Sequence, residues 1–141
     1  MNNDFNDLLQ DALDMPYEEK INLTKEAVDK LYNVLIRNNK DEAMPDMLKI
    51  FGYFIKLDNI IAFDEIQLLI DAMGLTISGQ QLNLYFKDMD FEEAENRVFY
   101  FKAALDDENV NDLLMIGLMV CASDGILTSE EQAALDELFN V

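Results

Sequence analysis

The chain has 141 residues, 50% of them hydrophobic, and its 29 Asp and Glu residues against 10 Lys and Arg residues give a formal net charge of −19. A disordered acidic tail would lack the apolar half, and a chain of this length buries roughly 68% of the surface that its unfolded form exposes. The sequence therefore predicts a single folded domain, residues 1–141, with an anionic surface. Such a surface repels phosphate backbones and anionic lipids, which disfavours direct nucleic-acid and membrane binding and favours basic proteins and cations.

The sequence lacks the residues that most hydrolytic sites and zinc sites require. It contains no His and a single Cys, Cys121, so it cannot form a Ser/His/Asp triad, a Cys/His dyad or an imidazole zinc site. It also has no glycine-rich phosphate loop. We therefore expect a protein that is not an enzyme, in which Cys121 is an inert core thiol because its neighbours are apolar and its flanks acidic.

Apolar residues recur at three- and four-residue spacing along the chain, and Pro and Gly are scarce, with 2 and 5 residues. These features predict an all-α fold of about seven to eight helices with short connections. Pro16 suits the start of the second helix, and Gly74 suits the end of the fourth. In chain order, the first predicted helix ends near residue 14. The other seven cover about 16–38, 41–57, 66–73, 82–89, 91–105, 113–122 and 129–140.

Neither the N-terminus nor the apolar runs indicate export or membrane insertion. The first 14 residues carry acids where a signal peptide would need basic residues followed by an apolar stretch. The longest apolar run, residues 113–122, is far shorter than the roughly 20 residues that span a bilayer. We expect a cytoplasmic protein with a buried core helix over this run.

An internal repeat appears when the sequence is compared with itself at a shift of 66 residues. Six identities then align: Leu48, Ile50, Asp58, Ile60, Glu65 and Leu69 fall on Leu114, Ile116, Asp124, Ile126, Glu131 and Leu135. In each copy an apolar helix ends at an Asp, a residue suited to left-handed backbone follows (Asn59 or Gly125), and a pair of acids opens the next helix. The repeat predicts two helix-loop-helix units related by a pseudo-two-fold axis.

Ordinary loop chemistry accounts for much of this unit. Asn59 and Gly125 tolerate the left-handed conformation after a helix, Thr128 and Glu131 have the spacing of a capping box, and the two aliphatic residues of each loop are expected to fill the core. The Asp at the end of each apolar helix is not explained in this way, because an anion there opposes the helix macrodipole. A backbone N–H of the loop, a Lys such as Lys56 or a bound cation would compensate it.

The acids of the two loops also suit a cation site, because Ca²⁺ prefers six to eight oxygen ligands. The second copy offers Asp124, Glu130 and Glu131, and the first offers Asp58, Asp64 and Glu65. An EF-hand loop does not fit, because its first and third positions would be Val120 and Ala122, which have no side-chain oxygen. A site assembled between the two copies remains as the cation hypothesis.

The segment LLMIGLMVCASDGILTSEEQAALDELF, residues 113–139, resembles the signature of the tellurite-resistance TerB-like family. That signature is an apolar helix ending in Ala-x-Asp-Gly, an aliphatic residue, and a Glu seven residues after the Asp. Asp124 and Glu131 have this spacing in the second copy, and Asp58 and Glu65 have it in the first. The resemblance covers roughly residues 46–141, the duplicated core, whereas the N-terminal helices in residues 1–45 lie outside it.

The resemblance implies a fold of two pseudo-symmetric helical halves and a cytoplasmic, non-enzymatic module of stress or metal-resistance systems. It implies that a divalent cation such as Ca²⁺ binds four acidic side chains, which are Asp58, Glu65, Asp124 and Glu131. It also implies protein partners, and the net charge favours partners with a basic surface.

The charge also leaves a second class of function open. A small acidic protein can imitate nucleic acid and inhibit a basic DNA-binding protein by occupying its groove. Such mimicry requires carboxylates spaced regularly over an exposed face, whereas the acids here cluster at helix starts and in loops. The acidic binding module is therefore our first interpretation and the nucleic-acid mimic the alternative.

Overall fold

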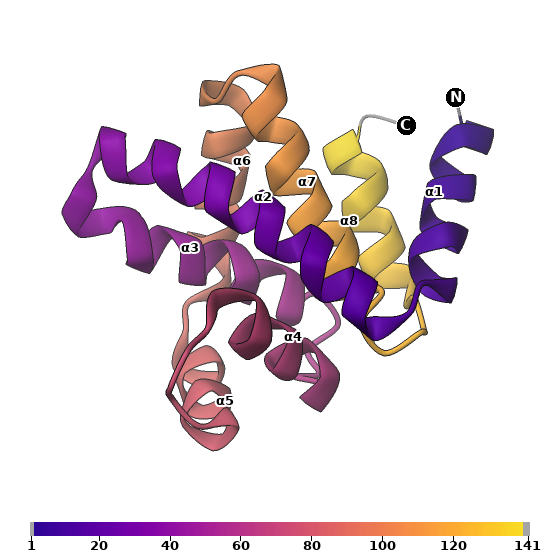
Figure 1. The fold of residues 1–141 in the computed structure, drawn as a ribbon, viewed down its shortest axis with the longest axis horizontal. Helices are drawn as coiled ribbons and strands as arrows, with labels where there is room; N and C mark the ends of the chain where they lie inside the picture. Colours follow the sequence, from indigo (N-terminus) through magenta and orange to yellow (C-terminus); the bar gives the residue numbers. More distant parts are fainter. Residues whose placement is uncertain (1, 140–141) are drawn as a thin grey trace.

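The computed structural model describes the backbone of residues 2–139 and the side chains of residues 7–138. Over this range the chain forms eight α-helices and no strand (Figure 1), which confirms the predicted all-α fold. The helices are α1 (Asn2–Asp14), α2 (Tyr17–Asn38), α3 (Lys40–Ile55), α4 (Phe63–Met73), α5 (Gly79–Asp88), α6 (Phe91–Ala104), α7 (Asp107–Cys121) and α8 (Ser129–Phe139). The predicted end of the last helix, residue 140, lies outside the described residues.

Side-chain caps and special backbone residues set most of the helix ends. Pro16 precedes α2, and Gly74, with φ of 64°, ends α4, as predicted. Ser78, Asp90 and Asp106 precede α5, α6 and α7, and the side chain of each accepts a hydrogen bond from the backbone N–H three residues later. Each bond satisfies one of the N–H groups that have no partner within the helix.

Some predicted boundaries were wrong. α7 begins at Asp107 rather than at residue 113, because Asp106 caps it and the acids of its first turn favour the positive end of the helix dipole. The two central helices also stop before the Asp residues that were predicted to end them. α3 ends at Ile55 and α7 at Cys121, so each Asp lies in the turn that follows.

α3 and α7 form the centre of the molecule, and the other helices pack around them. Within the apolar run of residues 113–122, every side chain except that of Met115 is buried, as predicted. α2 packs against both central helices, passing in front of α7 and beside α3 (Figure 1), and buries Leu31 and Leu35. The N-terminal region therefore contributes to the same core. Among residues 2–139, no helix combines the length and apolar character that crossing a membrane requires.

Gly117 allows α7 to pack closely against α3. A Cβ atom built at this position would overlap the ring of Phe54, which projects from α3 and is fully buried. The aromatic ring thus occupies the space that a side chain on α7 would fill. This contact constrains the spacing of the central helix pair, because packed interiors have few voids into which an aromatic ring can move.

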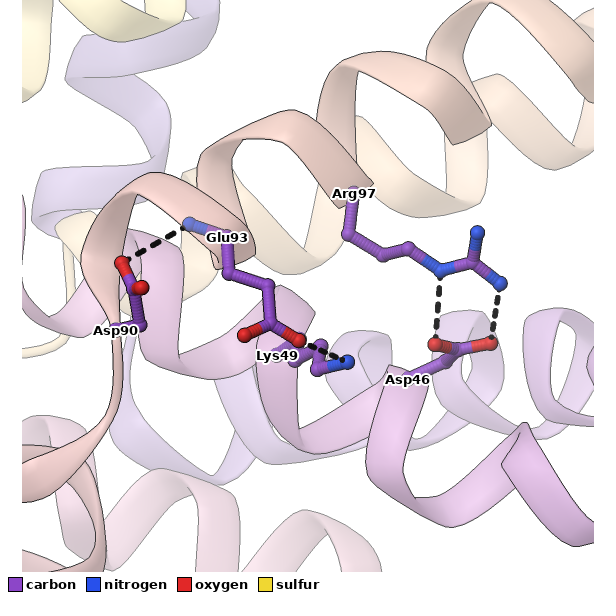
Figure 2. A network of polar contacts seen from close by, with 5 residues as sticks. All are labelled: Asp46, Lys49, Asp90, Glu93 and Arg97. Carbon is purple, nitrogen blue, oxygen red and sulfur yellow. Dashed lines mark hydrogen bonds and ion pairs between the residues drawn. The ribbon is translucent and has the colours of Figure 1, made fainter.

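Polar contacts join α3 to α6 (Figure 2). Arg97 donates from Nε and Nη2 to the two carboxylate oxygens of Asp46, at 2.9 and 3.0 Å. The Asp46 side chain is only 6% exposed, and the guanidinium lies over the Tyr100 ring, 4.9 Å from its centroid. The planar fork of Arg makes this a bidentate, charge-assisted pair.

We expect Asp46→Ala to lower the free energy of unfolding by about 1–2 kcal/mol, because it leaves the Arg97 guanidinium without its charged partner. The matched control is Lys49→Ala, which breaks the 2.9 Å ion pair with Glu93 beside it (Figure 2). The Glu93 side chain is 61% exposed, and such surface pairs contribute about 0–1 kcal/mol. Urea unfolding of both variants measures the difference, and equal losses would contradict a special role for Asp46.

Candidate cation site at the paired acidic loops

The α3–α4 loop (residues 56–62) and the α7–α8 loop (residues 122–128) have the same backbone design. Asn59 has φ of 62° and Gly125 has φ of 78°, so both adopt the left-handed conformation that the sequence predicted. The preceding Asp in each loop accepts a hydrogen bond from the backbone N–H two residues later. The bonds are Ile60 N–H to Asp58 Oδ1 and Ile126 N–H to Asp124 Oδ1, each 3.0 Å long.

These bonds identify one partner of each Asp among the three that the sequence analysis considered. The backbone N–H of the loop is the partner in both copies, in an Asx turn. Lys56 has another role, because its Nζ donates to the carbonyl of Met89 at 2.8 Å. Each Asp uses Oδ1 in its turn, and Oδ2 takes part in neither bond.

The two Glu residues of the predicted site cap the helices that follow the loops. Glu65 Oε1 accepts from the Ala62 N–H at 2.9 Å, and Glu131 Oε1 accepts from the Thr128 N–H at 3.0 Å. Thr128 completes the predicted capping box, because its Oγ1 accepts from the Glu131 N–H at 3.2 Å. Ala62 has no side-chain oxygen, so α4 has only half of this motif. Both Glu side chains are buried, with 4% of each residue exposed.

Electrostatic interactions join the four acids across the two loops. The pKa of Glu65 is raised from 4.5 to about 9, chiefly by burial and in part by the charges of Glu131, Asp58 and Asp124, while the hydrogen bond from the Ala62 N–H opposes this rise. Burial also raises the pKa of Glu131, with added contributions from Asp58 and Asp124. Asp58, Asp124 and Glu131 thus lie close enough to Glu65 for their charges to act on it. Asp64 and Glu130, the other two candidates, are exposed on the first turns of α4 and α8.

Cys121 lies close to the buried acids. It is 1% exposed, and burial raises the pKa of its thiol well above the usual value, an effect that Glu131 and Glu65 strengthen. Because the thiolate is the reactive form, this environment suits the predicted inert core thiol.

Lys20 is a contributor to the site region that the sequence analysis missed. It projects from α2, is 4% exposed, and donates from Nζ to the carbonyl of Ala122 at 2.7 Å. Burial lowers the pKa of Lys20, while the charges of Asp124 and Asp64 raise it. The sequence holds a signal for this, because Lys20 falls on the buried helical stripe of α2 that Val28 and other apolar residues define.

The prediction that both aliphatic residues of each loop fill the core was wrong for one residue of each pair. Ile60 and Ile126 are 65% and 66% exposed, whereas Ile61 and Leu127 pack against the core. Successive side chains of an extended segment point to opposite sides, so only one residue of each pair can face inward.

The described side chains do not form a ready-made metal cage. Among residues 7–138, no three His, Cys, Asp or Glu side chains are arranged so that they could hold a metal ion together. A cation that binds the four acids would therefore take further ligands from water or loop carbonyls, or would draw the Glu side chains out of their caps.

Comparison of the chain with protein-family models gave no match. Comparison with curated proteins and with solved structures likewise gave no match. The TerB-like resemblance therefore rests on the loop motif and its repetition, and the function is argued from the site itself.

Proposed function

We propose that the protein is a non-catalytic, acidic binding module whose paired loops bind a divalent cation such as Ca²⁺. The observation that carries this proposal is the matched pair of Asx turns at Asp58 and Asp124 beside Glu65, whose pKa is raised by burial and by repulsion from the charges of Glu131, Asp58 and Asp124. A divalent cation relieves such repulsion, and hard cations bind carboxylate oxygens in flexible geometries. Lys20 interacts with Asp124 and Asp64, and its single positive charge offsets only part of the negative charge of the two loops.

The two Asp residues are the first ligands in this proposal. Their hydrogen bonds use Oδ1, so Oδ2 of Asp58 and of Asp124 can bind a cation without loss of either turn. Ca²⁺ accepts water and backbone carbonyls as its remaining ligands, which suits a site without a complete cage of side chains. Glu65 and Glu131, whose pKa values are raised by burial, become ligands if they lose their protons and turn away from the helix caps.

The module acts through a protein partner in this proposal. A net charge of −19 attracts a basic protein surface and repels nucleic acid. The TerB-like resemblance adds the expectation of a cytoplasmic role in a stress or metal-resistance response.

Cation binding is tested by thermal unfolding of chelator-treated protein while Ca²⁺, Mg²⁺ or Mn²⁺ is titrated at constant high ionic strength. High salt screens general repulsion, so a saturable rise in the midpoint reports specific binding. A cation at 100 times its Kd stabilises the folded state by about 2.7 kcal/mol. We expect this rise in the parent and its loss in the double variant Asp58→Asn with Asp124→Asn.

The matched control removes the same charge elsewhere, by combining Asp88→Asn with Glu92→Gln at two exposed positions. This control should retain the rise in midpoint. A parent without a saturable rise, or a rise that persists when both loop Asp residues are replaced, would overturn the cation proposal.

A further inference from the structure

An apolar groove lies between α4 and α5, which pack together at one end of the molecule (Figure 1). Its volume is about 660 Å³, within the range of small binding pockets. The groove is lined by Ile61, Phe63, Ile66, Gly79, Asn83 and Leu84, among other uncharged residues. Gly79 has no side chain, so the start of α5 does not project into the groove.

The groove is bordered by apolar side chains that the fold leaves in water. Phe63 is 73% exposed and Leu84 is 61% exposed, and these are two of the most exposed large apolar residues in the described part of the chain. Neither belongs to the buried face of its helix, because α4 buries Ile66, Leu68, Leu69 and Ala72, and α5 buries Leu82 and Phe86. Contiguous exposed apolar surface beside a groove is typical of a protein-binding site.

The charge around the groove indicates the kind of partner. The lining carries no charged side chain, whereas the exposed Asp64 directly follows Phe63 in the first turn of α4 and the chain as a whole has a net charge of −19. A second copy of this chain would bring another net charge of −19 to the contact, and nucleic acids and anionic lipids are also repelled. Charge complementarity therefore selects a segment that is basic as well as apolar.

We propose that the groove between α4 and α5 binds a basic amphipathic helix of a partner protein. Apolar side chains of that helix lie against Phe63 and Leu84, and its Lys and Arg side chains face the acidic surface beside the groove. This is the helix-in-groove mode of recognition, in which side chains at helical spacing anchor the segment. The inference rests on the proposed function in taking a basic protein as the partner, but it does not require the cation.

The test uses a fluorescein-labelled model helix of about 14 residues, or four turns, made of Leu and Lys with Leu at helical spacing. A peptide of the same composition, scrambled to destroy the apolar face, is the control probe. Fluorescence anisotropy in the presence of EDTA should show saturable binding of the amphipathic helix alone. The double variant Phe63→Ser with Leu84→Ser should weaken this binding at least about tenfold, the equivalent of one lost anchor.

Ile126→Ser is the matched control variant, because Ile126 is equally exposed at 66% but does not line the groove. It should bind the peptide as the parent does. Equal binding of the scrambled peptide, or unchanged binding by the groove variant, would show that attraction depends on charge alone and would overturn the proposal. Absence of binding to the parent would overturn it too, as would self-association of the parent that the groove variant abolishes.

A measurement on the unmodified protein removes any dependence on folding of the variants. Amide NMR shifts on addition of the amphipathic helix should change within residues 61–66 and 79–84, and changes centred elsewhere would contradict the proposal. Because EDTA removes free cations, this result is independent of the Ca²⁺ titration. Peptide binding without a cation effect would support the groove proposal and overturn the cation proposal. A cation effect without peptide binding would support the cation proposal and overturn the groove proposal.

Discussion

Gly117→Ala is expected to lower the free energy of unfolding by about 2–3 kcal/mol. The new Cβ would overlap the ring of Phe54, which is fully buried between α3 and α7 and cannot move without disturbing its neighbours. Overpacking of this kind costs about 1–3 kcal/mol, occasionally more. The higher helix propensity of Ala offsets at most about 1 kcal/mol of this cost. Urea unfolding, with the slope and the midpoint measured separately, gives the free energy.

Gly52→Ala is the matched control on the facing central helix. A Cβ there would overlap the end of the Met89 side chain, which is flexible and only half-buried, and would lie 3.0 Å from the buried ring of Phe86, which must shift by only a few tenths of an ångström. Met89 can turn aside, so the gain in helix propensity compensates the contact, and we expect a change of less than about 1 kcal/mol. Equal losses in the two variants would show that close approach at Phe54 is not special.

The contrast between these two glycines illustrates what sequence periodicity can and cannot predict. Apolar residues at helical spacing predicted the all-α fold, and Asn59, Gly74 and Gly125 marked left-handed positions, because both signals depend on a few neighbouring residues. A glycine within a helix gives no such signal. Whether Gly117 meets a rigid ring or a flexible chain depends on a residue of another helix.

Some features of the candidate site could likewise be predicted from the sequence, and others could not. The 66-residue repeat indicated that Asp58 and Asp124 would occupy equivalent positions, and their two Asx turns have the same hydrogen bond. It could not show that Glu65 is buried while the adjacent Asp64 is exposed, because that depends on which face of α4 packs inward. It also could not show the bond from Lys20 to Ala122, which joins residues 102 positions apart.

Glu65→Gln is expected to stabilise the protein by about 3–5 kcal/mol at pH 8 and to reduce the dependence of stability on pH. The pKa of Glu65 is about 9 in the folded protein, against an ordinary value of 4.5. Between these values the folded protein holds a proton that the unfolded chain releases, so stability falls as the pH rises through this window. The limiting slope is about 1.4 kcal/mol per pH unit.

The amide preserves the structural role of the side chain while removing its charge. Gln at this position can still accept the hydrogen bond from the Ala62 N–H, as Gln81 does from the Ser78 N–H at the start of α5. Glu93→Gln is the control, because Glu93 occupies the same position in the first turn of α6 but is exposed. Chemical unfolding of the parent and both variants at pH 5 to 9 gives the three curves. Parallel curves for the parent and Glu65→Gln would contradict a strongly raised pKa.

The same pKa governs the proposed cation site. A cation competes with the proton for the Glu65 carboxylate, so Ca²⁺ should stabilise the parent more at pH 9 than at pH 6 and should displace a proton when it binds. In Glu65→Gln the increase in Ca²⁺ stabilisation between these pH values should be smaller, although Glu131 still contributes. Stabilisation that increases equally in parent and variant would show that Glu65 remains a helix cap when the cation binds. The site would then consist of Asp58 and Asp124 with water, and Glu65 would act only through its burial in the core.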